Sequence, residues 1–154
     1  MPKTIIEQFP KEIRIPKQDG TVVLEVAEFF CDTLQGENFA GYPASFLRLQ
    51  GCLLDCVWCD TLEVWRKGNK YSISELLDLI EENGMVERFK NGQHLVLTGG
   101  SPLKQQDSLI ALINLFRESF GFKPFIEIEN ETVKVPKQEL IDLVDCWNNS
   151  PKLE

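Results

Sequence analysis

The sequence predicts an α/β protein with a mainly parallel sheet, because strand-like segments rich in apolar residues alternate along the chain with segments of helical periodicity. Leu76, Leu77 and Ile80 recur at the spacing of a helix with one buried face. The segment 94–98 (HLVLT) is short and mostly apolar, which is typical of a buried parallel strand. The 154 residues are enough for one domain with its own core.

Each expected element follows from its local composition and from the residues, such as glycine and proline, that interrupt helices and strands. We expect strands over 21–30, 44–50, 94–98 and 124–129, helices over 72–84, 105–119 and 137–144, and a last strand near 144–147. Residues 33–43 contain two glycines and are expected to form a loop. Residues 1–20 carry three prolines and are expected to be an N-terminal arm with at most a short edge strand, leaving 21–154 as the core domain.

The helix ends carry recognisable signals. Ser72-Ile-Ser-Glu75 has the pattern of a capping box, in which the hydroxyl accepts from a free amide and the glutamate reaches back to the first residue. Gly84 and Gly121 follow the last periodic residues of two helices, where a left-handed C-terminal residue is common.

Charge and apolar patterning exclude several classes of protein. The chain carries 16 basic and 24 acidic residues, a net charge of −8, so we expect no nucleic-acid partner. No segment has the roughly 20 consecutive apolar residues of a membrane span, and the N-terminus lacks the pattern of a signal peptide. Five cysteines without a secretory signal suggest reduced thiols and a cytoplasmic location.

Three cysteines lie close together in a polar segment. Cys52, Cys56 and Cys59 have the spacing C-x3-C-x2-C, which can bring three thiolates into one small volume. Three thiolates are one fewer than a closed zinc site or a fully ligated iron–sulfur cluster uses, so a four-iron cluster would keep one iron open to a small ligand. Zinc with a fourth ligand elsewhere, and three unrelated core cysteines, are the alternatives.

The cysteine segment and several others resemble a known family. The C-x3-C-x2-C spacing with Trp58 before the last cysteine is similar to the signature of radical S-adenosylmethionine enzymes, and Thr98-Gly99-Gly100 resembles their glycine motif. More specifically, the chain resembles the 7-carboxy-7-deazaguanine synthase family. This likeness rests on the segments Thr33-Leu-Gln-Gly-Glu37, Gly41-Tyr-Pro-Ala, Phe46-Leu-Arg48-Leu, Trp58-Cys59-Asp60-Thr61, Leu97 to Leu103 with Gln105, and Ser150-Pro-Lys152, in family order.

The resemblance implies a partial (β/α) barrel and a set of cofactors. Cys52, Cys56 and Cys59 would hold a [4Fe–4S] cluster whose open iron chelates S-adenosyl-L-methionine, and reductive cleavage of that cofactor would yield a 5′-deoxyadenosyl radical. Thr61 would bind Mg²⁺, an ion that takes oxygen ligands, and loop capping is the alternative role for Asp60 and Thr61. The other cofactor-binding residues implied by the resemblance are Trp58, Gly99, Gly100, Ser101, Glu129, Ser150 and Lys152.

The resemblance also implies a substrate and a reaction. The family converts 6-carboxy-5,6,7,8-tetrahydropterin to 7-carboxy-7-deazaguanine with loss of ammonia, in queuosine-type biosynthesis. Leu34, Gln35, Gly36 and Glu37 would contact the pterin. Arg48 would receive the substrate carboxylate, a role that suits its planar fork, while a structural ion pair is an equal alternative for this residue.

The chain departs from the family pattern at three places. Ser101 replaces a glutamate that binds the cofactor amino group, Asn38 replaces a frequent glycine, and only Leu153 and Glu154 follow Ser150-Pro-Lys152. We therefore expect a short or C-terminally truncated member of the family. A partial barrel leaves an open sheet edge, so we expect a homodimer, with an electron donor such as flavodoxin or ferredoxin as a further partner.

Two other hypotheses about function remain open. A glycyl-radical activating enzyme of the anaerobic ribonucleotide reductase type would use the same cysteine signature at a similar length. The other hypothesis is a non-catalytic binding protein, because Ser101 replaces the cofactor-binding glutamate and the C-terminal end is short. Outside these motifs, Cys31 and Cys146 are expected to be core cysteines, and His94 is expected to be a satisfied or solvated histidine rather than a general base.

Overall fold

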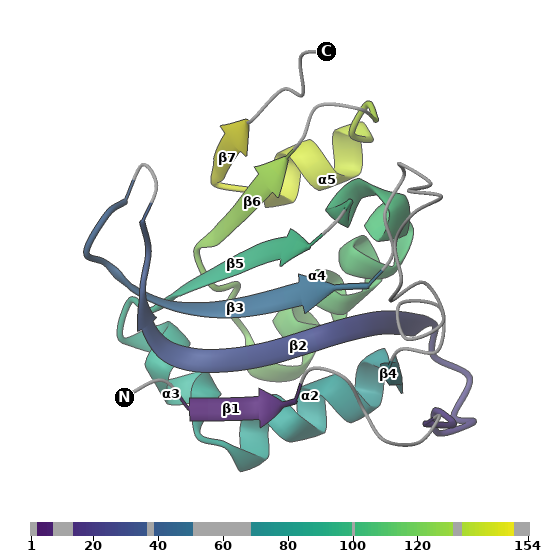
Figure 1. Ribbon diagram of the computed structural model, residues 1–154. Coiled ribbons are helices and arrows are strands. Elements are labelled where there is room, and N and C mark those ends of the chain that lie inside the picture. Colours follow the sequence, from purple (N-terminus) through teal and green to yellow (C-terminus); the bar gives the residue numbers. More distant parts are fainter. Residues whose placement is uncertain are drawn as a thin grey trace, which may run out of the picture.

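The computed structural model describes residues 3–7, 14–36, 39–50, 69–99, 101–130 and 134–149, which form one seven-stranded sheet with helices packed on it (Figure 1). The strands are β1 (Lys3–Ile6), β2 (Val23–Leu34), β3 (Pro43–Leu49), β4 (Asn69–Ser72), β5 (His94–Gly99), β6 (Ile126–Asn130) and β7 (Cys146–Asn149). The helices are α2 (Ile73–Glu82), α3 (Met85–Lys90), α4 (Gln106–Phe120) and α5 (Gln138–Leu143), with a 3₁₀ turn, η1, over Pro102–Gln105.

The sheet has a parallel half and an antiparallel half. Its strand order is β1-β2-β3-β5-β6-β7, with β4 also paired to β2. The strands β3, β5, β6 and β7 run parallel, as the alternation of strands and helices predicts. β2 pairs antiparallel with β1, β3 and β4, an arrangement that the strand pattern did not predict. The α/β class is confirmed, and the N-terminal strands extend the parallel sheet with an antiparallel edge.

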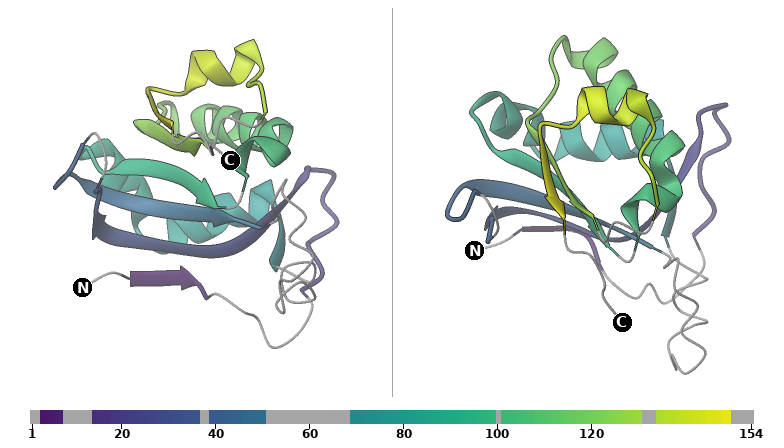
Figure 2. Two further views of the ribbon diagram at one scale, coloured as in Figure 1. Left: turned by 45° about the horizontal axis from the view of Figure 1, so that its top comes forward. Right: turned by 90° about the horizontal axis from the view of Figure 1, so that it is seen from above.

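The helices lie together on one face of the sheet, and the apolar core fills the space between them (Figure 2). The inward side chains of β3 and β5, such as Leu47 and Leu97, pack there with the buried stripe of α4. Among the described elements, no helix covers the opposite face, which is called the helix-free face below (Figures 1 and 2). No helix in the described ranges is long and apolar enough to cross a membrane.

Most sequence-predicted elements are confirmed, with shifted ends. The capping box at Ser72 is formed, and Gly84 and Gly121 both adopt the left-handed conformation expected of them. Two elements were missed, the short helix α3 and the strand β4 that precedes α2. β2 also continues to Leu34, into residues predicted to be a loop, because its pairing with β3 extends to Pro43.

Of the two cysteines outside the triad, the prediction of a core cysteine is confirmed for Cys31 and not for Cys146. Cys31 is buried in the core, and Cys146 is half-buried on β7. Burial raises the pKa of the Cys31 thiol, which keeps it protonated and unreactive at neutral pH.

The N-terminal segment is fastened to the start of α2. Arg14 forms an ion pair with Glu75 and lies over the ring of Tyr71, 4.0 Å from its centroid. The backbone amide of Lys17 donates to Glu75 at 2.5 Å. The hydrogen bond from Arg14, opposed by partial burial and aided by the Lys17 amide, lowers the pKa of Glu75 to about 2 from 4.5.

This shift predicts a pH dependence of stability. Because the folded-state pKa of Glu75 is the lower one, its contribution is complete above pH 4.5 and is lost as the pH falls towards 2. Glu75→Gln should therefore remove about 1–2 kcal/mol at pH 7, and the difference from wild type should shrink as the pH falls from 4.5 to 2. Urea unfolding across this range tests it. Glu82→Gln, at the far end of α2, is the charge-matched control, and an equal loss at pH 2.5 and pH 7 would contradict the prediction.

Candidate functional site

A row of polar side chains crosses the helix-free face near the carboxyl ends of the parallel strands. Glu28 of β2 lies opposite Arg48 of β3, and Arg48 is paired in register with Thr98 of β5. The Thr98 hydroxyl donates to the carboxylate of Glu129 on β6 at 2.7 Å. These four residues, called the polar row below, come from four strands, and each points away from the core because its neighbours in the strand point towards it.

Arg48 makes an ion pair within this row. Its Nε donates to Glu28 Oε1 at 3.2 Å, and the two side chains are 39% and 25% exposed. A structural ion pair, one of the two roles predicted for Arg48, is thus present. It uses one edge of the guanidinium, and within the described ranges the two terminal nitrogens of Arg48 donate to no other group. The planar fork therefore remains able to bind a carboxylate.

The next row on the same face is mainly apolar. Phe30 and Phe46 lie opposite each other on β2 and β3, and their rings stack with centroids 5.3 Å apart and planes 14° apart. Val96 follows on β5 and is fully buried. A stacked pair of aromatic rings thus lies directly beside the charges of the polar row, an arrangement that suits a ligand with an apolar body and a carboxylate.

A buried polar cluster occupies the amino end of the same face. Glu127 on β6 is fully buried, and its carboxylate accepts hydrogen bonds from three side chains. Gln35 and Asn148 each donate to Oε1 at 3.1 Å, and His94 Nδ1 lies 2.8 Å from Oε2. The expectation that His94 is a satisfied histidine agrees with this geometry, because its ring is engaged by the carboxylate.

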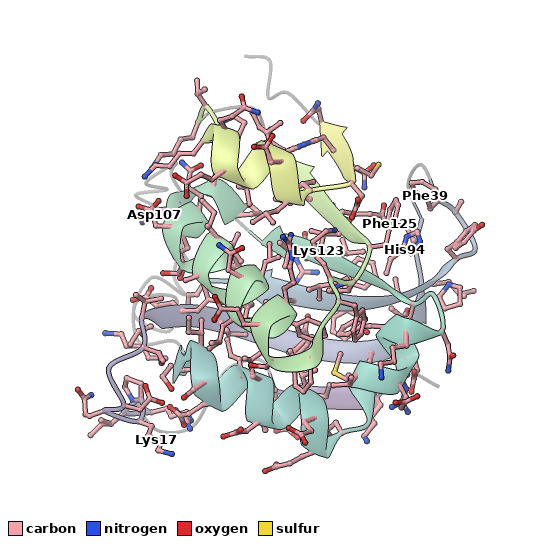
Figure 3. All side chains as sticks on the ribbon, turned by 180° about the vertical axis from the view of Figure 1, so that it is seen from behind. Lys17, Phe39, His94, Asp107, Lys123 and Phe125 are labelled. Carbon is pink, nitrogen blue, oxygen red and sulfur yellow. The ribbon has the colours of Figure 1, made fainter. Side chains whose placement is uncertain are left out.

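Aromatic rings enclose His94 on the side away from Glu127. Its ring stacks on Phe125 at 4.1 Å and on Tyr42 at 5.1 Å, and it meets the edge of Phe39 at 5.0 Å. Figure 3 shows His94, Phe39 and Phe125 gathered at one end of the sheet. This enclosure removes the cluster from water, so each of its hydrogen bonds counts more than one at the surface.

Replacing the buried carboxylate should be costly. In Glu127→Gln, the new NH₂ group faces either the amides of Gln35 and Asn148, which already donate, or His94 Nδ1, which must then be the acceptor tautomer, so we expect a loss of about 1–3 kcal/mol in unfolding free energy. Chemical denaturation measures it. Asp142→Asn is a control for the change in charge, since Asp142 is exposed on α5 and accepts only from Gln138. Equal stabilities of the two variants would contradict the structural role of Glu127.

The predicted substrate residues that precede β3 and are described, namely Leu34, Gln35 and Gly36, lie near the amino end of β3, away from Gly99. Gln35 donates its backbone amide to Tyr42, and its side-chain oxygen accepts from the Gly36 amide at 2.8 Å. Leu34 is 65% exposed. Because β3 pairs Ala44 with His94 and Leu49 with Gly99, roughly 16 Å of strand separates the two ends, at about 3.3 Å per residue. Of the predicted substrate residues, Arg48 alone lies in the polar row.

Gly99, at the carboxyl end of β5, is required by packing against β3. Its φ is +129°, and a Cβ at this position would lie 2.4 Å from the carbonyl oxygen of Leu49 and 2.8 Å from its nitrogen. Only a residue without a side chain fits there. The last residue of β5 is therefore held against Leu49, the last residue of β3, shortly before the cysteine segment begins.

The remaining predicted residues divide into placed and undescribed ones. Ser101 is almost fully buried at the start of η1, and Glu129 accepts from Thr98 in the polar row. Outside the described residues lie Glu37, Asn38, Cys52, Cys56, Trp58, Cys59, Asp60, Thr61, Gly100, Ser150 and Lys152. Within the described ranges, no group of three or more His, Cys, Asp or Glu side chains could hold a metal ion.

Sequence reasoning missed several residues of this face. Glu28, Phe30 and Glu127 are absent from the motifs, although their alternation with core residues along β2 and β6 was a usable signal. On the helix-covered side, Asn130 and Asn149, hydrogen-bonded to each other at 3.2 Å, line a groove of about 410 Å³ together with Ile141 of α5. Such cross-strand partners follow from register, which single segments do not encode.

The chain is similar to proteins of known family. Residues 38–148 match the model of a family described as a 4Fe-4S single cluster domain. A 7-carboxy-7-deazaguanine synthase from Koribacter versatilis is 32% identical over 79% of this chain and 51% of its own length. The corresponding figures are 35%, 62% and 48% for the synthase from Escherichia coli K12, and 32%, 87% and 57% for that from Pyrobaculum aerophilum.

A solved structure agrees with these relatives. The crystal structure of QueE from Escherichia coli superposes with a TM-score of 0.61 and 31% identity, covering 85% of this chain and 60% of that one. The resemblance drawn from the motifs and the partial barrel fold are both confirmed. The chain spans about half the length of the curated relatives it matches.

Proposed function

The chain belongs to the 4Fe-4S single cluster domain family, and from this premise we propose that it is a 7-carboxy-7-deazaguanine synthase. It would convert 6-carboxy-5,6,7,8-tetrahydropterin to 7-carboxy-7-deazaguanine with loss of ammonia. The similarity to synthases at 32–35% identity supports this assignment. The observation that carries it in the structure is the polar row beside the stacked rings of Phe30 and Phe46.

The helix-free face suits the proposed substrate. The two terminal nitrogens of the Arg48 fork can donate to two carboxylate oxygens, a bidentate contact that lysine cannot make. The rings of Phe30 and Phe46 offer an apolar surface for the flat part of the pterin, and Glu28 and Glu129 offer acceptors for its ring N–H groups. The substrate carboxylate would lie at Arg48 on β3, and its ring would lie against Phe30 on β2 and Phe46 on β3.

The proposed cofactors fit the donor set of the chain. Cys52, Cys56 and Cys59 would hold a [4Fe–4S] cluster, which when bound supplies one electron for reductive cleavage of S-adenosylmethionine. Gly99 brings backbone to the end of β3, and Glu129 and Ser101 lie at the same end of the sheet, where ligands of parallel α/β sheets bind. Trp58, Gly100, Ser150 and Lys152 would complete that cofactor site, and Thr61 would bind Mg²⁺.

The proposal includes partners and a location. We propose a cytoplasmic homodimer that receives electrons from flavodoxin or ferredoxin. The end strands support self-association, because β1 and β7 each pair with a single strand in the described part of the sheet.

Anaerobic reconstitution tests the proposal. The protein is loaded with iron and sulfide and then given reductant, S-adenosylmethionine, Mg²⁺ and 6-carboxy-5,6,7,8-tetrahydropterin. A product with the absorbance and mass of 7-carboxy-7-deazaguanine supports the synthase. Cleavage of S-adenosylmethionine with the pterin left intact would contradict it and favour a glycyl-radical activating enzyme. A protein that binds the cluster and cleaves nothing would be a binding protein of this family.

A further inference from the structure

The side chain of Gln105, the last residue of η1, makes a two-way contact with the backbone of a distant strand. Its Oε1 accepts from the Glu25 amide at 2.8 Å, and its Nε2 donates to the Glu25 carbonyl at 2.9 Å and to the Gln50 carbonyl at 3.1 Å. A side-chain amide thus pairs with β2 as a neighbouring strand would. All three partners are backbone groups, so the contact depends on the path of the chain and not on the side chains of Glu25 or Gln50.

Glu25 is the point where both ends of the cysteine segment meet β2. On the outgoing side, the Gln50 amide donates to the Glu25 carbonyl at 3.0 Å. On the returning side, β4 pairs Lys70 with the same residue. Arg14 adds a hydrogen bond to the Lys70 carbonyl at 2.8 Å, so the returning end is also held by the N-terminal segment.

Gln105 also belongs to the segment that follows the glycine motif. Gly99 lies against the backbone of Leu49, and η1 begins three residues later, at Pro102. The chain around the glycine motif is therefore joined twice to the chain that leads into the cysteine segment. Gly99 lies against Leu49, and Gln105 donates to the Gln50 carbonyl. Neither contact requires a bound cofactor.

We propose that Gln105 is a positioning residue that holds Glu25 of β2 and the outgoing end of the cysteine segment, at Gln50, in register with η1. Its consequence for cofactor binding rests on the proposed function. Under that function the chain after Gln50 leads to the cluster cysteines and the chain between β5 and η1 contacts S-adenosylmethionine, so loosening the Gln105 contact should weaken binding of that cofactor.

The variant Gln105→Met removes all three hydrogen bonds at nearly constant side-chain size. The freed backbone groups border a cleft of about 530 Å³ that is lined by Glu25, Gln50, Lys70 and Gln105 among others, so water can replace the lost bonds and the fold should survive. Ser108→Ala is the matched control, because the Ser108 hydroxyl ties α4 to the Val23 carbonyl of β2 at 3.1 Å without contacting Gln50.

Hydrogen exchange of the cofactor-free protein tests the structural step. We expect the amides of Glu25 and Gln50 to exchange about 10-fold faster in Gln105→Met, with α4 and β6 unchanged and with Ser108→Ala like wild type. Faster exchange at Glu25 alone would overturn the inference, because Gln105 would then hold one residue only. Faster exchange throughout the chain would overturn it too, since Gln105 would then act on global stability.

A spectroscopic titration tests the consequence. The electron paramagnetic resonance spectrum of the reduced, reconstituted protein is followed as S-adenosylmethionine is added. We expect Gln105→Met to need about 10-fold more of the cofactor for half of the spectral change, with the starting cluster spectrum retained. An unchanged half-saturation would overturn the coupling. Failure of wild type to build a cluster would count against the proposed function, and the exchange experiment would still decide the role of Gln105.

Discussion

Arg48→Met is expected to lower kcat/KM for 6-carboxy-5,6,7,8-tetrahydropterin by about 1000-fold while the protein stays folded and still cleaves S-adenosylmethionine. Two charge-assisted hydrogen bonds to the substrate carboxylate, at about 1.5–3 kcal/mol each, would be lost together, and 1000-fold corresponds to about 4 kcal/mol. The Arg48 side chain is 39% exposed, so its removal leaves no buried cavity. The measurement is steady-state kinetics with product formation and cofactor cleavage followed separately.

Two further variants separate recognition from the ion pair. Arg48→Lys keeps the charge and loses the planar fork, so it should recover only part of the lost kcat/KM. Glu28→Gln keeps an oxygen that can accept from the Arg48 Nε, so kcat/KM should fall by less than about 10-fold. If Glu28→Gln is as damaging as Arg48→Met, the pair has a structural role and Arg48 does not receive the substrate.

Gly99→Ala is expected to destabilise the protein by about 3–5 kcal/mol. The new methyl group would lie 2.4 Å from the Leu49 carbonyl oxygen, which is backbone and cannot turn aside as a flexible side chain could. Strain from the left-handed φ adds about 1–3 kcal/mol to this clash. Urea denaturation at neutral pH measures the loss, without any cofactor.

Gly92→Ala is the matched control for this effect. Gly92 also has a positive φ, +99°, but a Cβ there would meet no atom within 4 Å. Its replacement should therefore cost only the backbone strain, about 1–3 kcal/mol. Similar losses at the two positions would show that the contact with Leu49 is unimportant and that Gly99 is conformationally, rather than sterically, required.

The parallel half of the fold could be predicted because its signals are local. β3 and β5 are short and mostly apolar, β6 alternates isoleucine with glutamate, and α4 is amphipathic over its whole length. The antiparallel half of the sheet was harder to predict from the sequence. β4 has only four residues, and β2 continues past its apolar part because β3 offers partners as far as Pro43. Those strands exist through pairing more than through their own composition.

The residues of the candidate site could likewise be predicted only in part. The likeness of motifs identified Arg48 and Glu129 as site residues, and the structure places both in the polar row. It did not reveal Glu28 or the stacked rings of Phe30 and Phe46, because these act only as partners across strands. For Gln35 the motif suggests a ligand contact, and only the structure shows that its side chain donates to the buried Glu127, 92 positions away.

The sequence alone thus determined the 154-residue chain's class and the order of its parallel strands and helices, and it predicted an iron–sulfur cluster at its cysteine segment. Periodicity, capping and ligand spacing act over a few residues, so they can be read directly. Only the tertiary structure decided which side chains share the helix-free face, why Gly99 must lack a Cβ, and where Gln105 binds. These depend on register between segments 20 to 90 positions apart, because a side chain's partners across a sheet are set by pairing and not by its neighbours in the chain.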